Sequence, residues 1–329
     1  MKVLVTGADG FLGSNLVREL IARKHTVVAA LQPGRHVGTL DGLPLERKIV
    51  DLRYRRETVA AFEGIDAAIH AAADTSTWPS RSPRRDAFNI VSTQNMIDGA
   101  LEAGVRRLVH IGTANSFPPG SAEHPRREEG LFEGPDYGLG YIDSKRRAHR
   151  RVLAAVSEKG LPAVVLCPTF MMGPFDSRPG PGRMILQVAK KGIPPLPPGG
   201  RNIVDVRNVA VAGANALEKG EVGESYILAG ENMHYGPLFQ TIAEVVGRPG
   251  FGHRVPKAGI LAFGALNSGI GAFFRRPPGI SFTMAKIACD ENFYDATTAK
   301  TVLGLPKTDV RQAVADSFAW LQRNGYLEE

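Results

Sequence analysis

Three glycines at three-residue spacing, placed directly after a short apolar segment, constrain this chain most. Residues 2–5, Lys-Val-Leu-Val, have the β-branched and apolar composition of a buried strand. Gly7, Gly10 and Gly13 follow, and apolar side chains then recur at helical spacing over 11–20. A strand, a glycine turn and a helix N-terminus together point free backbone N–H groups and the helix dipole at an anion. Glycine also lets a pyrophosphate approach the backbone closely, so the stretch predicts a dinucleotide site; a glycine-rich turn that binds nothing is the alternative.

Strand-like and helix-like segments alternate through the first half of the chain. This alternation predicts an α/β fold, a doubly wound parallel (Rossmann) sheet with ligands at the carboxyl ends of its strands. The expected strands are 2–6, 26–31, 48–50, 66–71, 106–112 and 162–167, and the expected helices lie near 11–23, 55–63, 86–103 and 138–159.

One helical segment, 86–103, also predicts which of its faces is buried. Phe88, Val91, Ile97 and Leu101 form a single apolar stripe, and Gly104 is expected to end the helix.

The composition of the sequence changes after Pro168, where glycine- and proline-rich loops surround short helical and strand-like stretches. We therefore expect a dinucleotide-binding domain over 1–170 and a smaller, interleaved region over 171–329 that mainly binds the substrate. Segments near 203–206 and 226–229 are candidates to return to the main sheet.

Composition narrows the classes of protein. The 329 residues include only two cysteines, which provide no disulfide framework and no thiolate metal cluster, so we expect a reducing, cytoplasmic location and no metal. A signal peptide is not expected, because the first residues already form the predicted strand. The longest apolar run, 258–274, is interrupted by Asn267 and Ser268 and is too short to span a membrane. We expect a helix pair of the substrate region there and no integral membrane association, with contact to a membrane surface as the alternative.

The net charge of +7 is concentrated in two arginine-rich stretches, 81–86 and 144–151. No interleaved aromatic residues and no nucleic-acid motif accompany them, so nucleic acid is not an expected partner. Solvated helix faces that steer anionic ligands explain the charge better.

Tyr141 and Lys145 are four residues apart on a predicted helix, so their side chains share one face. A tyrosine has a pKa of about 10, and a nearby ammonium lowers it, so the pair can shuttle a proton to or from a carbonyl oxygen. Thr113 follows the strand 106–112 and can hydrogen-bond the reacting oxygen, although a strand-end cap is its simpler role. His70 and His110 lie in apolar strand patterns and are expected to be core residues.

These motifs resemble those of extended short-chain dehydrogenases/reductases of the NAD-dependent epimerase/dehydratase type. The resemblance is carried, in chain order, by TGADGFLG at 6–13, DL at 51–52, HAAAD at 70–74, Tyr-Ile-Asp-Ser-Lys at 141–145 and CPTFMMGP at 167–174. The chain is most similar to the branch of dihydroflavonol reductases, 3β-hydroxysteroid dehydrogenases and hopanoid-associated sugar epimerases.

The resemblance implies roles for individual residues. Tyr141 is the implied proton donor or acceptor, Lys145 binds the nicotinamide ribose and tunes Tyr141, and Thr113 holds the reacting oxygen. The implied cofactor contacts are Gly7, Gly10, Phe11, Leu12 and Gly13 at the pyrophosphate, Asp51 and Leu52 at the adenine, Ala71, Ala72 and Ala73 beside the ribose and nicotinamide, and Pro168, Thr169, Phe170 and Met171 against the nicotinamide.

Two departures from the family pattern bear on the chemistry. Thr113 stands where the family often has a serine pair, so it carries the hydroxyl alone. After the second strand, the chain has neither the acidic residue that would bind a ribose 2′-hydroxyl nor an arginine at Gln32, where related reductases often carry one; Arg35 and His36 lie just beyond and are the implied contacts of a 2′-phosphate. The missing acid favours NADP over NAD.

The sequence indicates the substrate-binding residues less specifically than the cofactor-binding residues. Trp78, Asn115 and Ser116 lie on loops after predicted strands, and Arg207 is placed where the family can bind a nucleotide phosphate. Phe170, Met171, Met172 and Phe175, together with 261–274, indicate either a partly apolar pocket or core packing.

We therefore expect an NADP(H)-preferring reductase or dehydrogenase that acts on a carbonyl or hydroxyl of a small, partly apolar molecule. The alternatives are a nucleotide-sugar epimerase or dehydratase with tightly bound NAD, and a non-catalytic dinucleotide sensor. The resemblance also implies a homodimer formed through the helices at 86–103 and 138–159.

Overall fold

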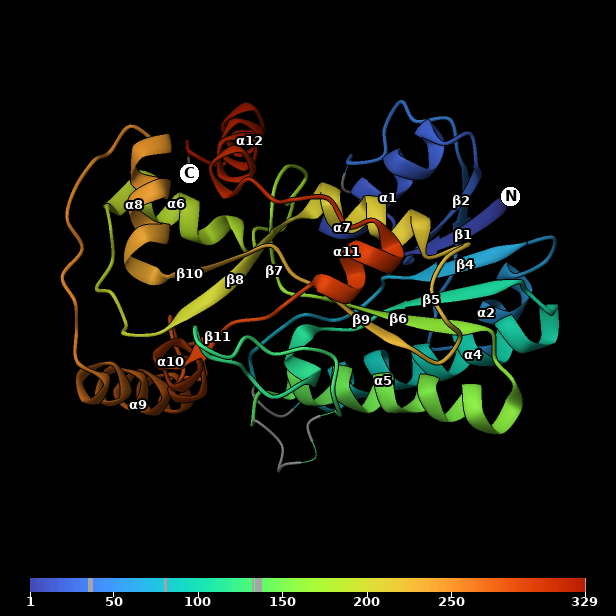
Figure 1. The fold of residues 1–329 in the computed structure, drawn as a ribbon, viewed down its shortest axis with the longest axis horizontal. Helices are drawn as coiled ribbons and strands as arrows, with labels where there is room; N and C mark the ends of the chain where they lie inside the picture. Colours follow the sequence, from blue (N-terminus) through green and yellow to red (C-terminus); the bar gives the residue numbers. More distant parts are fainter. Residues whose placement is uncertain (35–37, 80–81, 132, 134–137, 329) are drawn as a thin grey trace.

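The computed structural model describes residues 1–34, 38–79, 82–131, 133 and 138–328. Its larger layer is a seven-stranded parallel sheet in the order β3-β2-β1-β4-β5-β6-β9 (Figure 1). The strands are β1 (Lys2–Thr6), β2 (Thr26–Leu31), β3 (Glu46–Ile49), β4 (Ala67–His70), β5 (Arg107–Ile111), β6 (Ala163–Pro168) and β9 (Ser225–Leu228). The doubly wound parallel sheet predicted from the sequence is confirmed.

Helices cover both faces of this sheet, which explains why its inner strands are mostly apolar. Every residue of β4 and β6 is buried. One face carries α1 (Phe11–Ala22), α7 (Val206–Asn215) and α11 (Thr297–Leu303), and the other carries α2 (Arg55–Ala61), α4 (Ser92–Ala103) and α5 (Gly140–Lys159) (Figure 1).

A second, four-stranded sheet lies beyond the carboxyl ends of the main strands, on the left in Figure 1. Its strands are β7 (Phe170–Met172), β8 (Gly200–Asp205), β10 (Glu231–His234) and β11 (Glu291–Asn292). The helices α6 (Gly182–Lys191), α8 (Tyr235–Val245) and α12 (Val310–Arg323) pack on it, and α9 (Lys257–Phe273) and α10 (Phe282–Cys289) form a separate pair.

The second half of the chain contributes to both sheets. β9 pairs in parallel with β6 and so completes the main sheet. The expectation that 203–206 returns to the main sheet is wrong, because β8 pairs with β10 on one edge and with β7 and β11 on the other. Both edges of β8 are therefore occupied within the smaller sheet.

The helical segment predicted over 86–103 is not one regular helix. A short helix α3 (Pro83–Asp86) and a π-helical turn η1 (Ala87–Val91) precede α4. Because the wider π turn rotates the chain about the helix axis, the predicted apolar stripe is broken, and Val91 is 40% exposed. Gly104 ends α4 in a left-handed conformation, as predicted.

Within the described residues, no helix combines the length and hydropathy needed to cross a bilayer.

Candidate active site

The glycine turn between β1 and α1 is fixed by close packing. Gly7 has φ +64°, and a Cβ on it would lie 2.8 Å from the backbone of Ala72. A Cβ on Gly13 would lie only 1.9 Å from the carbonyl oxygen of Gly7. The turn therefore fits against the first turn of α1 and the segment after β4 only because these positions carry no side chain.

This turn lies at the point where the strand order reverses, between β1 and β4. Helix α1 begins at Phe11, and its N-cap residue, Gly10, offers no side chain to bind the first N–H groups. Those N–H groups lack intrahelical partners by helix geometry and suit an anion. The tight glycine cradle and the uncapped helix fit a dinucleotide pyrophosphate.

A loop from the second half of the chain is tied to the glycine turn. The Nδ2 of Asn15 donates to the carbonyl oxygen of Pro174 at 3.1 Å. The guanidinium of Arg18 lies 3.6 Å from the ring centroid of Phe175, and Arg178 pairs with Asp9 at 3.5 Å. The loop between β7 and α6 thus borders the region expected to hold the cofactor.

Asp51 and Leu52, the residues implied at the adenine, follow β3 at the same edge of the sheet. Arg53 binds the Asp51 carboxylate with two nitrogens, at 2.6 and 3.0 Å, and holds the pKa of that carboxyl below its usual range. The carbonyl oxygen of Leu52 accepts from Asn95 Nδ2 at 2.8 Å. Both residues are buried, so their backbone is held in one place.

Tyr141 and Lys145 lie one turn apart near the start of α5, as the spacing predicted. Lys145 is only 4% exposed, and its Nζ donates to the carbonyl oxygen of Ile111 at the end of β5. Burial lowers the pKa of Lys145 to about 8. The ammonium is therefore anchored to the strand that carries Thr113.

The expected lowering of the Tyr141 pKa is wrong for this arrangement. Desolvation raises the pKa of Tyr141 to about 12. Removal of Tyr141 from solvent disfavours its charged phenolate, and the Lys145 ammonium is directed at the Ile111 carbonyl. Tyr141 is accordingly a neutral phenol at pH 7.

Thr113 combines both roles considered for it. It caps the short 3₁₀ helix η2 (Ala114–Ser116), and its hydroxyl accepts from the Asn115 N–H at 3.3 Å. A hydroxyl that accepts one bond still has its own O–H to donate. Asn115 is partly exposed, whereas Ser116 is fully buried and its Oγ has no partner among the described residues.

Asn89, which the sequence pattern did not single out, connects three parts of this site. Its Nδ2 donates to the Ser144 hydroxyl at 2.9 Å and to the Asp74 carbonyl at 3.1 Å, and its Oδ1 accepts from the Asp74 N–H at 2.7 Å. One amide thereby joins the π turn, the segment after β4 and the residue before Lys145. The sequence indicates this role only weakly: Asn89 lies within a predicted helix, and a side-chain amide that is buried there needs hydrogen-bond partners.

A layer of buried histidines lies near Lys145. His70 binds Thr6 at 2.8 Å and Thr93 at 3.2 Å, which confirms it as a core residue. The ring of His110 lies 5.3 Å from that of His70, but both of its nitrogens are buried without a partner among the described residues. Burial and the Lys145 charge lower the pKa of His70 to about 3 and that of His110 well below its ordinary value, so both are neutral.

The substrate candidates differ in their surroundings. The loop that carries the partly exposed Trp78 is held by Arg85, a fully buried residue whose guanidinium donates to the carbonyl oxygens of Ser76 and Pro79. Arg207 is bound by Asp205 at 2.6 Å and by Asp316 at 2.7 Å, so its charge is already matched.

The remaining predicted residues are Arg35 and His36, the implied contacts of a 2′-phosphate, and the apolar stretch 261–274. Arg35 and His36 lie outside the described residues. The stretch 261–274 belongs to α9 and its C-cap residue, and its large apolar side chains Phe263, Leu266 and Phe273 are exposed and so are not core residues.

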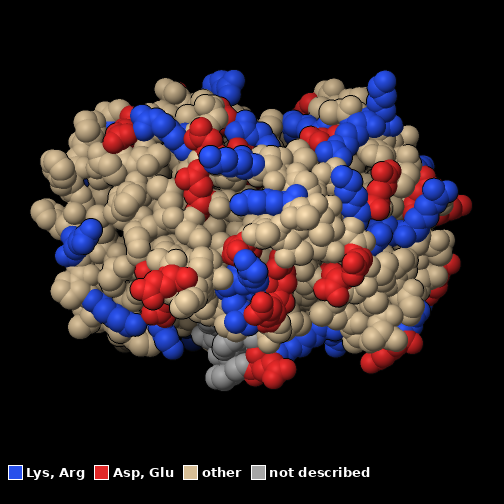
Figure 2. Space-filling view, in the orientation of Figure 1, with Lys and Arg blue, Asp and Glu red and all other residues tan. Residues whose placement is uncertain are grey.

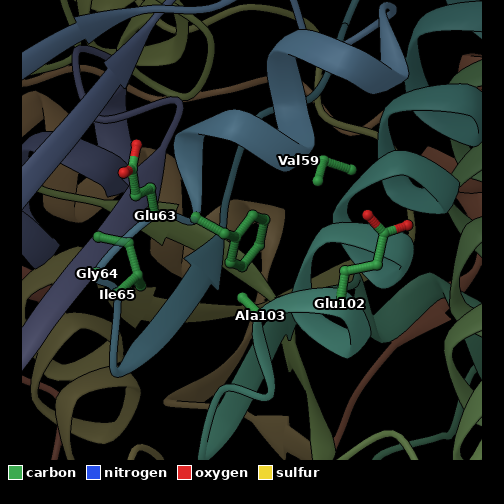
Figure 3. A pocket seen from close by; sticks show the side chains of 7 residues that line it. Val59, Glu63, Gly64, Ile65, Glu102 and Ala103 are labelled. Carbon is green, nitrogen blue, oxygen red and sulfur yellow. The ribbon is translucent and has the colours of Figure 1, made fainter.

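The hollow shown in Figure 3 is not this site. It is lined by residues of α2, α4 and the connection into β4, among them Phe62, Gly64 and Glu102. These residues lie at the amino ends of the parallel strands, opposite the edge where such sheets bind ligands. We assign no ligand to it.

Comparisons with known proteins agree with this geometry. A model of the NAD dependent epimerase/dehydratase family matches residues 3–229. The chain is 32% identical to sterol demethylase protein B of Methylococcus capsulatus, over 99% of this chain and 100% of that protein. It is 29% identical to 2-alkyl-3-oxoalkanoate reductase of Stenotrophomonas maltophilia, over 95% of this chain and 97% of that protein. The crystal structure of gox2253 superposes with a TM-score of 0.84 at 30% identity, covering 98% of each chain.

Proposed function

The chain belongs to the NAD-dependent epimerase/dehydratase family, within the extended short-chain dehydrogenases/reductases, and on this premise we propose that it is an NADP(H)-preferring reductase of a carbonyl on a partly apolar small molecule. The observation that carries the proposal is that Lys145, one helical turn from Tyr141, donates to the carbonyl oxygen of Ile111, two residues before Thr113, at the carboxyl edge of the main sheet.

The three side chains have distinct tasks. When bound, the reduced nicotinamide supplies a hydride to the carbonyl carbon. Thr113 donates its free O–H to the carbonyl oxygen and so orients it. Tyr141 transfers its proton to that oxygen as the negative charge develops, and a phenol with a pKa of about 12 is fully protonated for this purpose. Lys145, anchored on Ile111 one helical turn along α5, binds the nicotinamide ribose and so orients the cofactor.

The phosphate-binding and substrate-binding parts divide the chain roughly in half. We place the dinucleotide on residues 1–170, with Gly7, Gly10 and Gly13 at the pyrophosphate, and the substrate mainly against 171–329. Asn115 and Trp78 remain the substrate candidates from the first half, because Ser116 presents no surface. Phe170 and Met171, which are partly buried in β7, are the proposed source of apolar surface in the substrate region.

The preference for NADP is supported by the sequence after β2. The stretch has no acidic residue to bind a ribose 2′-hydroxyl, and Arg35 and His36, just beyond Gln32, are the proposed partners of a 2′-phosphate. An apolar substrate is supported by the relatives, since a sterol and a 2-alkyl-3-oxoalkanoate are both largely hydrocarbon.

Replacement of Tyr141 tests the reaction. We expect Tyr141→Phe to lower kcat for carbonyl reduction by about 100- to 10,000-fold, because the proton donor is lost. NADPH affinity, measured by fluorescence titration, should stay nearly unchanged. Tyr54→Phe is the matched control, since Tyr54 is exposed on the surface and should keep full activity. A Tyr141→Phe protein that retained most of its activity would disprove the assignment.

A nucleotide-sugar epimerase or dehydratase is the second candidate, and retention of the cofactor separates the two. Such enzymes reduce and reoxidise NAD within one cycle, whereas a reductase exchanges its cofactor at every turnover. We expect the denatured protein to release no stoichiometric NAD and the native protein to bind NADPH more tightly than NADH. Tightly retained NAD would support the epimerase, although the pairing of Arg207 with Asp205 and Asp316 leaves that residue poorly placed for a phosphate.

We also propose a cytoplasmic location, from the low cysteine content, and a homodimer through α4 and α5, from the family resemblance. Light scattering on the purified protein gives the oligomeric state directly.

A further inference from the structure

Helix α9 has the reverse of the usual pattern for a helix in water, because most of its large apolar side chains are exposed. Its buried residues are Ile260, which packs with Ala285 and Cys289 of α10, and two glycines: a Cβ on Gly264 would lie 2.6 Å from Ala285, and Gly271 lies against the segment 276–278. Most of its large apolar side chains point outward. Phe263 is 57% exposed, Leu266 63% and Phe273 82%.

These exposed residues form one continuous surface. Residues 263, 266, 270 and 273 follow one another at three- and four-residue steps, which places them on one face of the helix. Phe274 and Phe282, at the ends of α9 and α10, are also exposed. We call this set, Phe263, Leu266, Ile270, Phe273, Phe274 and Phe282, the α9 apolar face. A monomer in water rarely shows a contiguous apolar patch of this kind unless it contacts something.

The charged side chains within residues 245–289, the segment that contains α9 and α10, are all basic. No Asp or Glu occurs between residues 245 and 289. Residues 251–289 instead contain Arg254, Lys257, Arg275, Arg276 and Lys286, all exposed. Lys257 pairs with Asp290, but no salt bridge of the other four occurs among the described residues. The corner of the molecule where α9 lies is mainly tan with scattered blue in the space-filling view (Figures 1 and 2).

We propose that the α9 apolar face docks the protein on an anionic lipid surface. Phenylalanine and leucine side chains on one face of a helix enter the boundary between headgroups and acyl chains, and flanking arginines and lysines bind anionic headgroups. The helix lies in the plane of the interface, since it is too short and too interrupted to cross a bilayer.

The charge pattern favours a lipid surface over a second copy of the chain. A symmetric pairing of two α9 faces would bring the two sets of cations together without an acid between residues 245 and 289 to match them. An anionic membrane matches the apolar surface and the cations at once.

Vesicle flotation tests the proposal on the full-length protein. We expect the protein to float with vesicles of phosphatidylcholine mixed with phosphatidylglycerol, and to float much less with phosphatidylcholine alone. The variant Phe263→Ser/Leu266→Ser/Phe273→Ser should lower the partition coefficient by about 100-fold or more, since three apolar side chains no longer enter the lipid. Arg275→Gln/Arg276→Gln should lower it by about 30-fold on the anionic vesicles alone.

The matched control replaces equally exposed apolar residues elsewhere. Ile49→Ser/Val222→Ser removes side chains that are 63% and 50% exposed on β3 and before β9, and it should float as the unmodified protein does. Unchanged NADPH affinity of the triple variant shows that it folds. Failure of the unmodified protein to float with either vesicle, or equal flotation of the triple variant, would overturn the proposal. A dimer that the triple variant converts to a monomer, without vesicle binding, would instead assign the face to a second copy.

Discussion

Lys145 shows how far burial changes the behaviour of a single residue. Its ammonium is almost without solvent, it donates to one carbonyl oxygen, and the neutral His70 and His110 lie nearby. Burial lowers its pKa from 10.5 to about 8, so the charged form, which the proposed reaction uses, is held at a cost in stability. Strain of this kind is expected at a functional residue.

Because burial lowers the pKa of Lys145, we expect the free energy of unfolding to depend on pH. The folded protein releases the Lys145 proton near pH 8, whereas the unfolded chain keeps it until about 10.5. Between these values the unfolded state binds more protons, so this group makes the free energy of unfolding rise with pH. Above pH 10 the raised pKa of Tyr141 acts in the opposite direction, because the folded protein then binds the extra proton.

Replacement of Lys145 measures this cost. We expect Lys145→Met to abolish turnover and yet to raise the free energy of unfolding at pH 7 by about 1–3 kcal/mol, as one pKa unit corresponds to about 1.4 kcal/mol. It should also flatten the rise in stability between pH 8 and 10. Urea unfolding at several pH values gives both quantities. The exposed Lys159, at the other end of α5, is the control, and Lys159→Met should change stability little. A loss of stability in Lys145→Met at pH 7 would contradict the interpretation.

At the scale of elements, the unit formed by β1, the glycine turn and α1 depends on contact between backbones. The helix starts where it does because Gly13 allows its first turn to approach the carbonyl oxygen of Gly7. Any side chain at 13 must push α1 away from β1 or open the turn, and either change enlarges the pyrophosphate cradle.

Gly13→Ala tests that contact. We expect the free energy of unfolding to fall by about 1–3 kcal/mol or more, the usual cost of overpacking, and NADPH affinity to fall with it. Gly236→Ala is the matched control, because Gly236 lies in α8 with open space around it and should be neutral or slightly stabilising. Calorimetry and fluorescence titration supply the two readouts. Normal NADPH affinity in Gly13→Ala would show that the cradle tolerates a side chain.

At the scale of the whole molecule, the two sheets are not successive units. β9, α7 and α11 come from the second half of the chain but pack on the main sheet, and β7 begins two residues after β6 ends. The glycine turn and the Tyr141 helix therefore face the smaller sheet across the carboxyl ends of the main strands (Figure 1). The α9–α10 pair lies at the far corner of the smaller sheet, so lipid docking there leaves the glycine turn uncovered.

The amino-acid sequence by itself determined the features that depend on local periodicity and sterics. The six strands of the first half lie within two residues of their predicted bounds, and Tyr141 and Lys145 share one helix face. Glycine spacing placed the turn because only residues without Cβ fit such close backbone contacts. These signals come from residues near one another in the chain, so they can be read without the fold.

Only the tertiary structure decided the features that depend on distant contacts. The pKa values of Tyr141 and Lys145 follow from burial by segments far away in the sequence. The role of Asn89 depends on partners at 74 and 144, and the π turn that positions it broke the predicted stripe. The exposure of the α9 apolar face could not be predicted from the sequence either, since an apolar helix has the same sequence whether it faces a core or a lipid surface. Burial is a property of the assembled chain, and local patterning leaves it open.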